Sequence, residues 1–402
     1  MRAETCDAIV LGGGAAGLMA ALIAGQRGCR VAVIEHNAEP GRKILISGGG
    51  RCNFTHMEAA ADRYLSASPH FIRSALARYT PRDFLKMVEK HRIAWHEKTP
   101  GQLFCSSSAR DILSMLLDEC AAGGVGLYTG ERITDVSGGE IFRVTTTARI
   151  LEAPSLVIAT GGLSIPKMGA SGFGLTLAAR FGLPVIPTAP GLVPLVFDGA
   201  EDEWMHALAG TSLPVMASFG KKRFTDGMVF THRGLSGPAI LQISSWIPEG
   251  ESFGLDLLPG YNVFDTLRAA RRERPRAGGI SVLNALMPER LARVLAPRLL
   301  GTSEAANWSD KTLRAAEAAL KQMRLLPSGT EGYAKAEVMT GGVDTRALSS
   351  QTMEARDVPG LYVVGEAVDV TGWLGGYNFQ WAWSGGHAAG LAIAARTHHQ
   401  KA

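Results

Sequence analysis

The stretch that decides the fold is residues 7–35, DAIVLGGGAAGLMAALIAGQRGCRVAVIE. The apolar run Asp7–Leu11 predicts a short buried strand, and the glycine-rich turn after it leads into an apolar helix over residues 18–26. A second apolar run, Arg30–Ile34, predicts the next strand, which ends at Glu35. A strand, a helix and a second strand within about 30 residues form a βαβ unit, which indicates a doubly wound α/β sheet.

The turn carries glycines in the order Gly12-x-Gly14-x-x-Gly17, with Ala15 and Ala16 in the variable positions before the third glycine. The first glycine of this pattern permits a tight turn, the second lets the backbone approach a pyrophosphate, and the third lets the helix pack closely on the strand. The N-terminus of the helix offers unpaired N–H groups to phosphates. We therefore expect a bound dinucleotide, and a glycine-rich turn without a ligand is the alternative.

The end of the second strand supports the same interpretation. Glu35 follows Gly17 by 18 residues, and a carboxylate at this place accepts hydrogen bonds from a ribose diol. We include the adjacent His36 in the expected site. Gly41, Arg42 and Lys43 come soon afterwards and would place two cations near the pyrophosphate.

Three segments favour FAD over NAD, and the first is the pair of cations after Gly41. Thr160, Gly161 and Gly162 close a strand after a predicted three-stranded meander, a layout common in flavin domains. Gly365 and Glu366 end the apolar strand at 361–364, where the acid would bind ribityl hydroxyls. The helix after Gly375 and Gly376 would point its N-terminus at the flavin N1/O2 edge and stabilise the anionic reduced flavin. Both ends of the chain would then build one FAD-binding domain.

The middle of the chain has a different character. Four prolines interrupt 184–194, and β-like segments such as Leu213–Phe219 and Arg223–Phe230 follow, then helices over 263–325, of which Trp308–Leu325 is the clearest amphipathic one. We predict that 1–186 and 334–402 form a discontinuous FAD-binding domain and that 187–333 is inserted, mainly β over 187–260 and mainly helical over 261–333. Within the first part, we predict helices starting after Thr80 and covering Ala109–Ala122, and a hairpin turn at Gly138-Gly139.

Composition limits the protein class. The net charge is +4, too small to imply nucleic-acid or membrane binding by itself, and the 48 glycines cluster at the ends of apolar runs. The five cysteines form no CxxC pair, so a zinc site, or any other metal site, is not expected. No apolar run is long enough for a membrane span and no secretory signal is visible, so we expect a cytoplasmic protein.

Three longer motifs carry a family resemblance. They are GRKILISGGGRCN at 41–53, THRGLSGPAILQ at 231–242 and GEAVDVTGWLGGYNFQWAW at 365–383. The chain resembles the BaiN/YhiN-like family of bacterial NAD(P)/FAD-dependent oxidoreductases over nearly its whole length. The resemblance implies a Rossmann-like, glutathione-reductase-type FAD-binding domain with an inserted β-barrel-like part and a small helical part.

The resemblance also implies a reaction. Activities within the family reduce a carbon–carbon double bond conjugated to a carbonyl, either in steroid-like enones or in the uracil ring of ribosomal RNA. NAD(P)H is the expected electron donor, docking transiently at the flavin face. Such a reduction needs a hydride from flavin N5, a proton for the α-carbon and a polar group that steadies the developing enolate.

Candidate residues for this chemistry come from the motifs. The glycine loop Ser47, Gly48, Gly49, Gly50, Arg51 is expected to cross the flavin, with Cys52 and Asn53 directly after it. Cys52 would be a proton donor with a pKa lowered by Arg51, or else a packed thiol. Tyr377, Asn378 and Gln380 would hold a substrate carbonyl or bind only the isoalloxazine. His232 would face the substrate or be structural.

Three functions remain open on the sequence. The first is reduction of an activated C=C bond in a small molecule. The second is reduction of a uracil base in ribosomal RNA, for which the arginine-rich segment 268–276 is the one hint, the alternative being a solvated helix end. The third is a non-catalytic flavin-binding interaction protein. The sequence does not indicate an oligomeric state.

Overall fold

The computed structural model describes residues 2–401, apart from the side chain of Glu201. The chain divides into two compact units, each described here by itself. Unit 1 contains the residues up to Ala189 together with those from Val338 onward, and unit 2 is Pro190–Glu337. Both ends of the chain thus contribute to unit 1. The residue bounds predicted for the insertion, 187–333, are close to those of unit 2.

Unit 1 is built on a five-stranded sheet in the order β22–β12–β2–β3–β8, in which every pairing is parallel. The strands are β2 (Ala8–Leu11), β3 (Val31–Glu35), β8 (Gly126–Thr129), β12 (Leu156–Ile158) and β22 (Leu361–Val363). All but the edge strand β8 are buried along their whole length. A parallel sheet covered on both faces requires continuous apolar runs, which is why the opening stretch of the sequence reads as it does.

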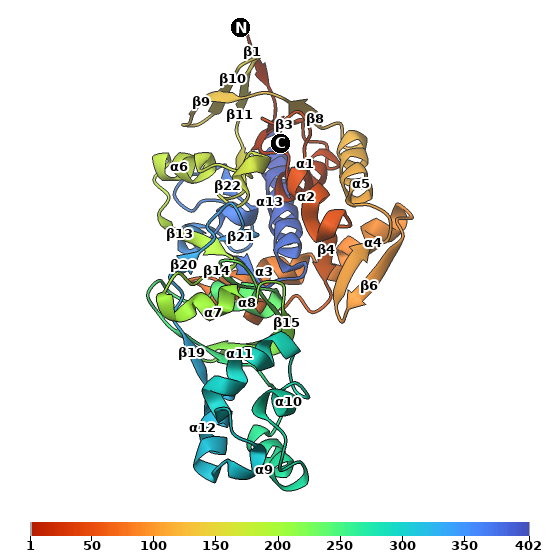
Figure 1. The fold of residues 1–402 in the computed structure, drawn as a ribbon. Helices are drawn as coiled ribbons and strands as arrows, with labels where there is room; N and C mark the ends of the chain where they lie inside the picture. The colour runs from red at the N-terminus through yellow and green to blue at the C-terminus, as the bar shows by residue number, and fades with distance from the viewer. Residues whose placement is uncertain (1, 402) are drawn as a thin grey trace. The chain divides into compact units, whose positions relative to one another are not determined.

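One helix packs against this sheet, and a second helix from the other end of the sequence packs on the first. Helix α1 (Ala15–Gly25) contacts α13 (Tyr377–Lys401), and Figure 1 shows them side by side in red and blue. A Cβ at Gly386 would lie 2.5 Å from the carbonyl oxygen of Ala16, and one at Gly390 would lie 2.7 Å from that of Ala20. Glycines four residues apart share one helix face, so they let α13 approach α1 closely. This packing brings the C-terminal segment back to the N-terminal glycine turn.

The predicted local elements of unit 1 are confirmed. Helix α4 (Pro81–Lys90) is N-capped by Thr80 in a capping box with Asp83, and α5 covers Ala109–Ala122. Strands β9 and β10 form the hairpin around Gly138-Gly139. The remaining helices and strands of unit 1 are α2 (Arg42–Ile46), α3 (Pro69–Arg78), α6 (Phe173–Arg180), β1 (Ala3–Thr5), β4 (Asn53–His56), β5 (Tyr64–Leu65), β6 (Trp95–Thr99), β7 (Gln102–Cys105), β9 (Ile133–Ser137), β10 (Phe142–Thr146), β11 (Ile150–Ala153), β13 (Val185–Gly191), β21 (Val338–Val343) and β23 (Thr371–Gly372).

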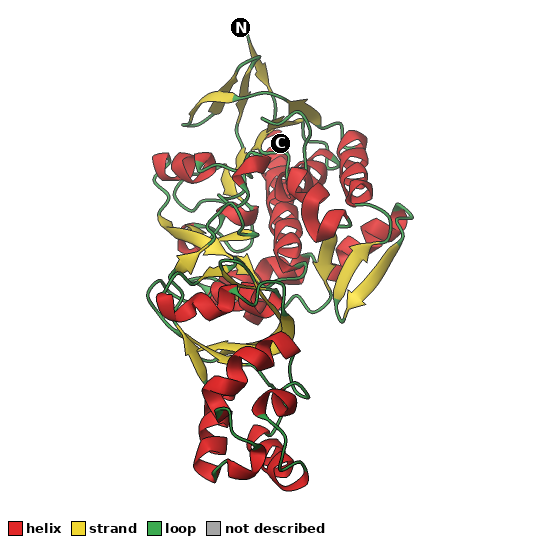
Figure 2. Cartoon of the chain, viewed as in Figure 1, coloured by secondary structure: helices red, strands yellow, loops and turns green. Residues whose placement is uncertain are grey.

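Unit 2 combines an antiparallel sheet with a group of helices, which Figure 2 shows in yellow and red. The sheet has the order β19–β18–β15–β16–β17–β14–β20 and corresponds to the expected barrel-like part. Its strands are β14 (Leu195–Val196), β15 (Ser212–Phe219), β16 (Lys222–Phe230), β17 (Gly234–Ser236), β18 (Phe253–Asp256), β19 (Met323–Leu325) and β20 (Gly329–Thr330). The helices are α7 (Glu203–His206), α8 (Pro238–Ser244), α9 (Val263–Glu273), α10 (Gly279–Leu283), α11 (Glu289–Leu300) and α12 (Asp310–Lys321).

The amphipathic helix predicted over Trp308–Leu325 is too long. Helix α12 ends at Lys321, and Met323–Leu325 is instead strand β19, paired antiparallel with β18. The unpaired edge of β18 offers backbone hydrogen bonds to these residues, and that tertiary contact overrides the helical pattern.

Residues 2–401 contain no helix that is both long and apolar enough to cross a membrane. The same residues contain no group of three or more His, Cys, Asp or Glu side chains that would hold a metal ion.

Candidate functional site

The turn between β2 and α1 requires glycine at two positions and has open space at a third. Gly12 has φ +107, and a Cβ there would lie 2.5 Å from the carbonyl oxygen of Ala159. A Cβ at Gly17 would overlap the carbonyl oxygen of Gly12. A Cβ at Gly14 would meet no atom within 4 Å. Gly12 and Gly17 therefore serve the fold, and the space beside Gly14 fits an approaching pyrophosphate.

Glu35 turns its carboxylate toward this glycine turn. Its Oε2 accepts a hydrogen bond from the Gly13 N–H at 2.9 Å, and its Oε1 accepts one from the Asn37 N–H at 2.8 Å. His36 Nδ1 lies 3.2 Å from the same carboxylate, while most of its ring is exposed. Helix α1 begins at Ala15 without a side-chain cap, so its N-terminal N–H groups are available to phosphates. These features fit the adenine-dinucleotide part of FAD.

The two cations expected at the pyrophosphate have specific protein partners. Gly41, with φ +67, donates its N–H to the Gly13 carbonyl and starts helix α2. Arg42 Nη1 donates to Asn37 Oδ1 at 2.8 Å. Lys43 Nζ lies 2.6 Å from the Glu366 carboxylate. The Lys43 charge is therefore directed at Glu366, a contact that the sequence did not suggest.

Glu366 is the centre of a cluster at the ends of two neighbouring strands, β12 and β22. Besides Lys43, its carboxylate accepts hydrogen bonds from Ser164 Oγ at 2.7 Å, from the Met339 N–H at 2.9 Å and from the Gly162 N–H at 3.4 Å. Burial by itself would raise the pKa of Glu366, but the Lys43 ammonium and these hydrogen bonds hold it below its ordinary value. A carboxylate has about four acceptor positions, so Glu366 orients this cluster rather than having a free face for ribityl hydroxyls.

The glycines around Glu366 shape the backbone of this cluster. Gly161 has φ +73 and Gly365 has φ +70, conformations that favour glycine. A Cβ at Gly162 would press on the Glu366 carboxylate at 3.1 Å. Thr160 Oγ1 is buried and has no hydrogen-bond partner among residues 2–401. The expected segments at 160–162 and 365–366 thus come together in space.

The loop Ser47–Gly50 follows α2, and its backbone is not regularly helical. Gly48, Gly49 and Gly50 all have positive φ, at +56, +67 and +83. A Cβ at Gly49 would meet no atom within 4 Å, so the loop presents bare backbone at that point. Ser47 Oγ donates to the Ile44 carbonyl and so braces the loop from inside. Such a loop suits close approach to a flat ligand.

Cys52 lies in an environment opposite to the one predicted. Its side chain is completely buried, its φ is +47, and burial raises the pKa of its thiol to about 12. Arg51, which was expected to lower this pKa, is exposed to solvent, where its charge is screened. The lowered-pKa prediction is therefore wrong, and the packed-thiol alternative describes Cys52 better.

Gly375 and Gly376 form the turn that starts α13. They have φ +107 and +97, and a Cβ at either one would lie 2.5 Å from a neighbour: the Gln102 side chain for Gly375 and the Thr55 backbone for Gly376. The turn therefore packs directly on β4 and β7. Asn53, at the start of β4, faces Gln102 and also contacts this turn.

Tyr377 stands at the first position of α13 and is stacked on His56. The two ring centroids are 4.3 Å apart, and the Tyr64 ring meets Tyr377 edge-on at 6.0 Å. Burial raises the pKa of the Tyr377 hydroxyl to about 12 and lowers the pKa of His56. At neutral pH this site therefore holds a protonated phenol beside a neutral imidazole.

Asn378 and Gln380 are occupied by structural contacts. The Asn378 side chain bridges to Gly372, accepting from its N–H at 2.8 Å and donating to its carbonyl at 3.0 Å. Gln380 is fully buried, accepts from Thr55 Oγ1 at 2.6 Å and donates to the Tyr79 carbonyl at 3.0 Å. The amides of both residues are thus used to hold the C-terminal turn and α13 in place. They do not have the free amide that carbonyl binding would need.

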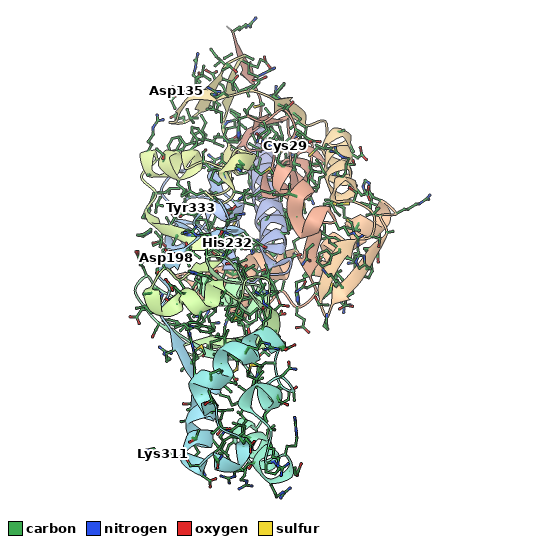
Figure 3. All side chains as sticks on the ribbon, in the orientation of Figure 1. Cys29, Asp135, Asp198, His232, Lys311 and Tyr333 are labelled. Carbon is green, nitrogen blue, oxygen red and sulfur yellow. The ribbon has the colours of Figure 1, made fainter. Side chains whose placement is uncertain are left out.

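His232 belongs to unit 2 and its side chain is exposed, in the turn where the Thr231 N–H donates to the Gly234 carbonyl at 2.7 Å. Figure 3 labels it among the side chains of that unit. Its predicted role at the substrate stays a prediction.

Sequence reasoning missed His56, Ser164 and Gln102. His56 ends the strand that follows the glycine loop, and that position was the available signal, because a polar residue ending a strand beside a ligand loop is a common site position. Ser164 and Gln102 carry no comparable signal. Their contacts with Glu366 and Gly375 depend on segments far away in the sequence.

The chain is similar to known proteins over nearly its whole length. The family model described as HI0933-like protein Rossmann domain matches residues 6–392. The chain is 48% identical over 386 residues to the ribosomal RNA dihydrouridine synthase of Escherichia coli (strain K12), covering 95% of this chain and 96% of that protein. It is 31% identical over 411 residues to the 3-dehydro-bile acid delta(4,6)-reductase of Clostridium scindens, covering 96% and 98%. Among solved structures, it is similar to a 3-ketosteroid-delta4-(5alpha)-dehydrogenase from Rhodococcus jostii RHA1, with a TM-score of 0.52, 12% identity and 98% of each chain covered, a likeness of fold alone.

Proposed function

The chain belongs to the HI0933-like family of FAD-dependent Rossmann oxidoreductases, and from this membership we propose that it reduces a uracil base in ribosomal RNA to dihydrouracil. One observation carries the proposal. The identity with the Escherichia coli ribosomal RNA dihydrouridine synthase is much higher than that with the bile acid reductase, and it extends over nearly the whole of both chains. The RNA substrate, expected second on the sequence, therefore becomes the first candidate.

Reduction of an enone in a small molecule is the second candidate, and the bile acid reductase favours it. The two substrates share their reacting group, because the C5=C6 bond of uracil is conjugated to the C4 carbonyl. In both, a hydride adds to the carbon β to the carbonyl and a proton adds to the α-carbon. One site in unit 1 would serve either reaction, so the substrate is decided by what else the protein binds.

The glycine turn at 12–17 and Glu35 would hold the adenine-dinucleotide part of FAD, and the loop 47–50 and the turn 375–376 would face the isoalloxazine. FAD, when bound, supplies the hydride from its N5. Lys43, held by Glu366 and Ser164, places a positive charge in this site. We propose NAD(P)H as the source of electrons. The reaction then balances in atoms and charge: uracil, NAD(P)H and one proton give dihydrouracil and NAD(P)⁺.

Tyr377 is the best candidate for the polar group that acts on the substrate. Its hydroxyl remains protonated at neutral pH because burial raises its pKa to about 12, so it can donate a hydrogen bond or a proton to a developing enolate. His56, stacked on its ring, fixes the orientation of the phenol. We place this reaction in the cytoplasm, where ribosomal RNA is available.

The deciding experiment measures dihydrouridine in ribosomal RNA by mass spectrometry. We expect a deletion strain to lose dihydrouridine at a site and the cloned chain to restore it. The purified holoprotein should form the same base in RNA from the deletion strain when NADH or NADPH is added. An unchanged dihydrouridine content, together with consumption of a steroidal enone, would move the function to the second candidate. A flavin that NAD(P)H does not bleach under anaerobic conditions would support the non-catalytic alternative.

A further inference from the structure

The positive charge of the chain is concentrated in the helical part of unit 2. Residues 259–322 contain eleven arginines and lysines against six aspartates and glutamates, an excess of five positive charges. The whole chain has a net charge of +4, so all the other residues together are slightly negative. A surface of this kind attracts polyanions.

The arginine-rich segment 268–276 presents only part of this charge freely, because three of its five arginines have acidic partners, while Arg274 and Arg276 have none among residues 2–401. Arg268 pairs with Asp265 at 3.2 Å, and Arg271 pairs with Asp310 at 2.7 Å. Arg272 pairs with the neighbouring Glu273. Much of the charge seen in the sequence run is therefore neutralised by local acids.

Part of the unneutralised charge lies on α12, at the rim of an open pocket. Arg314 and Lys311 are exposed, stand three residues apart on one face of α12 and have no acidic partner among residues 2–401. The Lys311 side chain, labelled in Figure 3, extends from the surface of the helical part. Arg314 borders a pocket of about 520 Å³ at the start of α9.

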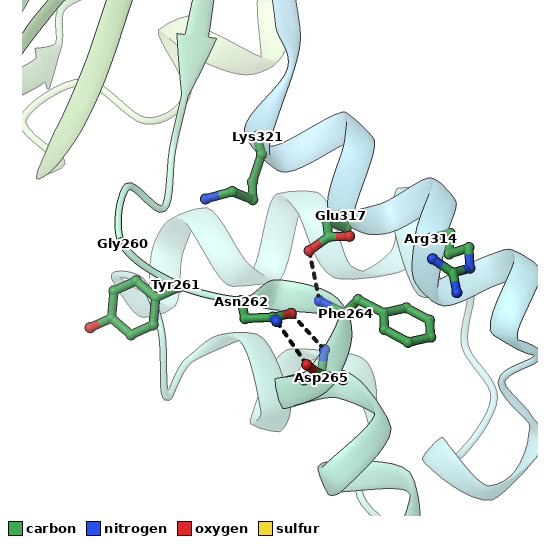
Figure 4. Close-up of a pocket in the computed structure, with 8 residues that line it drawn as sticks. All are labelled: Gly260, Tyr261, Asn262, Phe264, Asp265, Arg314, Glu317 and Lys321. Atoms are coloured by element: carbon green, nitrogen blue, oxygen red, sulfur yellow. Dashed lines mark hydrogen bonds between the residues drawn. The ribbon is translucent and has the colours of Figure 1, made fainter.

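This pocket combines aromatic and basic groups. Tyr261 is 49% exposed and stands at the opposite end of the pocket from Arg314, with Phe264 between them in the view of Figure 4. The Arg314 guanidinium lies over the Phe264 ring, 4.4 Å from its centroid, and Arg268 approaches the same ring at 5.6 Å. Lys321 lines the pocket as well, although its ammonium is held by Asp256 at 3.1 Å.

Two acids line the same pocket, and both are occupied. Glu317 Oε1 accepts from the Phe264 N–H at 3.1 Å. Asp265 accepts from the Asn262 side chain at 2.7 Å and pairs with Arg268. They hold the start of α9 in place, and they leave Arg314 as the unpaired charge of the pocket.

We propose that this pocket, lined by Tyr261, Phe264, Arg314 and Lys321 and flanked by Lys311 on the adjoining turn, is a binding site for a single-stranded segment of RNA. A base would stack on the exposed Tyr261 ring, and neighbouring phosphates would contact Arg314 and Lys311. An exposed aromatic ring beside unpaired cations suits nucleic acid better than an acidic protein surface, which offers nothing planar to stack. The inference rests on the proposed function, since it names how unit 2 would recognise that substrate.

The test measures binding of the full-length holoprotein to a fluorescein-labelled oligouridylate by anisotropy, over a series of salt concentrations. Tyr261→Ala should raise Kd about tenfold with little change in the salt slope, because it removes stacking only. Arg314→Ser should raise Kd and reduce the slope of log K against log salt by about 0.7, the value for one phosphate contact on a single strand. Arg293→Ser is the matched control, because Arg293 is also exposed but pairs with Glu289 on α11.

Three outcomes decide the matter. Wild-type affinity in both Tyr261→Ala and Arg314→Ser overturns the inference, and so does equal weakening by the Arg293 control. Competition by polyglutamate as effective as that by unlabelled oligouridylate would indicate an acidic protein partner and also overturns it. The proposed function is judged separately, by dihydrouridine in RNA of the complemented strain: if wild type restores it while these variants bind normally, only the RNA site is wrong.

Discussion

The Lys43 ammonium lies 2.6 Å from the Glu366 carboxylate, although 323 residues separate the two in the chain. Lys43 follows the N-terminal βαβ unit, and Glu366 follows strand β22 near the other end. The pair therefore joins the two parts of the sequence that build unit 1, at the place where the cofactor is expected.

Lys43→Met should destabilise the protein. It leaves the Glu366 carboxylate in a buried cluster without its cation, and the free energy of unfolding at pH 7 should fall by about 1–2 kcal/mol. The pKa of Glu366 should rise, because the cation that lowers it is gone. A carboxyl group whose pKa is lower in the folded protein than in the unfolded chain stabilises the fold at pH values above the unfolded pKa. Raising the folded pKa of Glu366 should therefore reduce its contribution to stability at pH 7. Urea unfolding followed by circular dichroism measures the effect.

Two variants control this experiment. Lys167→Met removes an exposed lysine of the same unit and should leave stability unchanged. Adding Glu366→Gln to Lys43→Met should recover part of the loss, because no unpaired charge remains. If Lys43→Met alone is as stable as wild type, the role assigned to the Lys43–Glu366 pair is wrong.

Gly14→Val should separate cofactor binding from folding. A Cβ at Gly14 meets no protein atom and the residue has φ −85, so the apoprotein should fold normally. The added side chain fills the space proposed for the pyrophosphate, and the Kd for FAD should rise at least about tenfold, or about 1.4 kcal/mol. Fluorescence titration of apoprotein with FAD measures it, and Gly139→Ala in the exposed β9–β10 hairpin is the control. Unaltered FAD affinity would place the cofactor elsewhere.

Tyr377→Phe should reduce turnover with the flavin still bound. It removes the hydroxyl proposed to act on the substrate and keeps the ring stacked on His56. We expect kcat for uracil reduction to fall about 100-fold, within the usual range for loss of a general acid, while FAD content and the visible spectrum stay the same. Retained turnover at wild-type level would exclude Tyr377 from the chemistry.

Cys52→Ala should have a small effect on turnover. The thiol is fully buried, so a substrate cannot reach its proton. We expect kcat within about threefold of wild type, because the change removes packing and not a reacting group. Steady-state kinetics on FAD-saturated protein decides this, and a loss as deep as that of Tyr377→Phe would restore Cys52 as the proton donor.

His387 should make the protein sensitive to mild acid. Burial and then the nearby Arg27 charge lower the pKa of His387 from 6.5 to about 4, and its ring is stacked on Tyr79 at 4.6 Å. The unfolded chain binds a proton below pH 6.5, and the folded protein resists it until about pH 4. The free energy of unfolding should therefore fall as the pH drops from 6.5 to about 4. Above pH 6.5, His387 should have no effect on the pH dependence of stability.

His387→Phe keeps the stacked ring and removes the titrating group. Between pH 7.5 and pH 5, the free energy of unfolding should fall less in this variant than in wild type, by on the order of 1 kcal/mol after allowing for solvent screening. His399 is an exposed histidine on the same helix, so His399→Asn should show the same pH dependence of stability as wild type. Identical pH dependence in His387→Phe and wild type would show that His387 does not titrate differently on folding.

The sequence by itself determined the FAD-type fold and the glycine turn. Strand and helix periodicity, the fingerprint at Gly12, Gly14 and Gly17, and the acid Glu35 are local properties, because backbone φ and the burial pattern of a parallel strand depend on neighbouring residues. For the same reason helix α5 and the capped start of α4 lie where they were predicted.

Only the tertiary structure decided which polar side chains are free. The amide of Gln380 is used up by Thr55 and Tyr79, about 300 residues earlier in the chain, and Lys43 is directed at Glu366. The thiol of Cys52 is buried rather than activated. A pKa or a hydrogen-bonding capacity depends on burial and on partners brought in by distant segments, and a linear pattern does not contain that information.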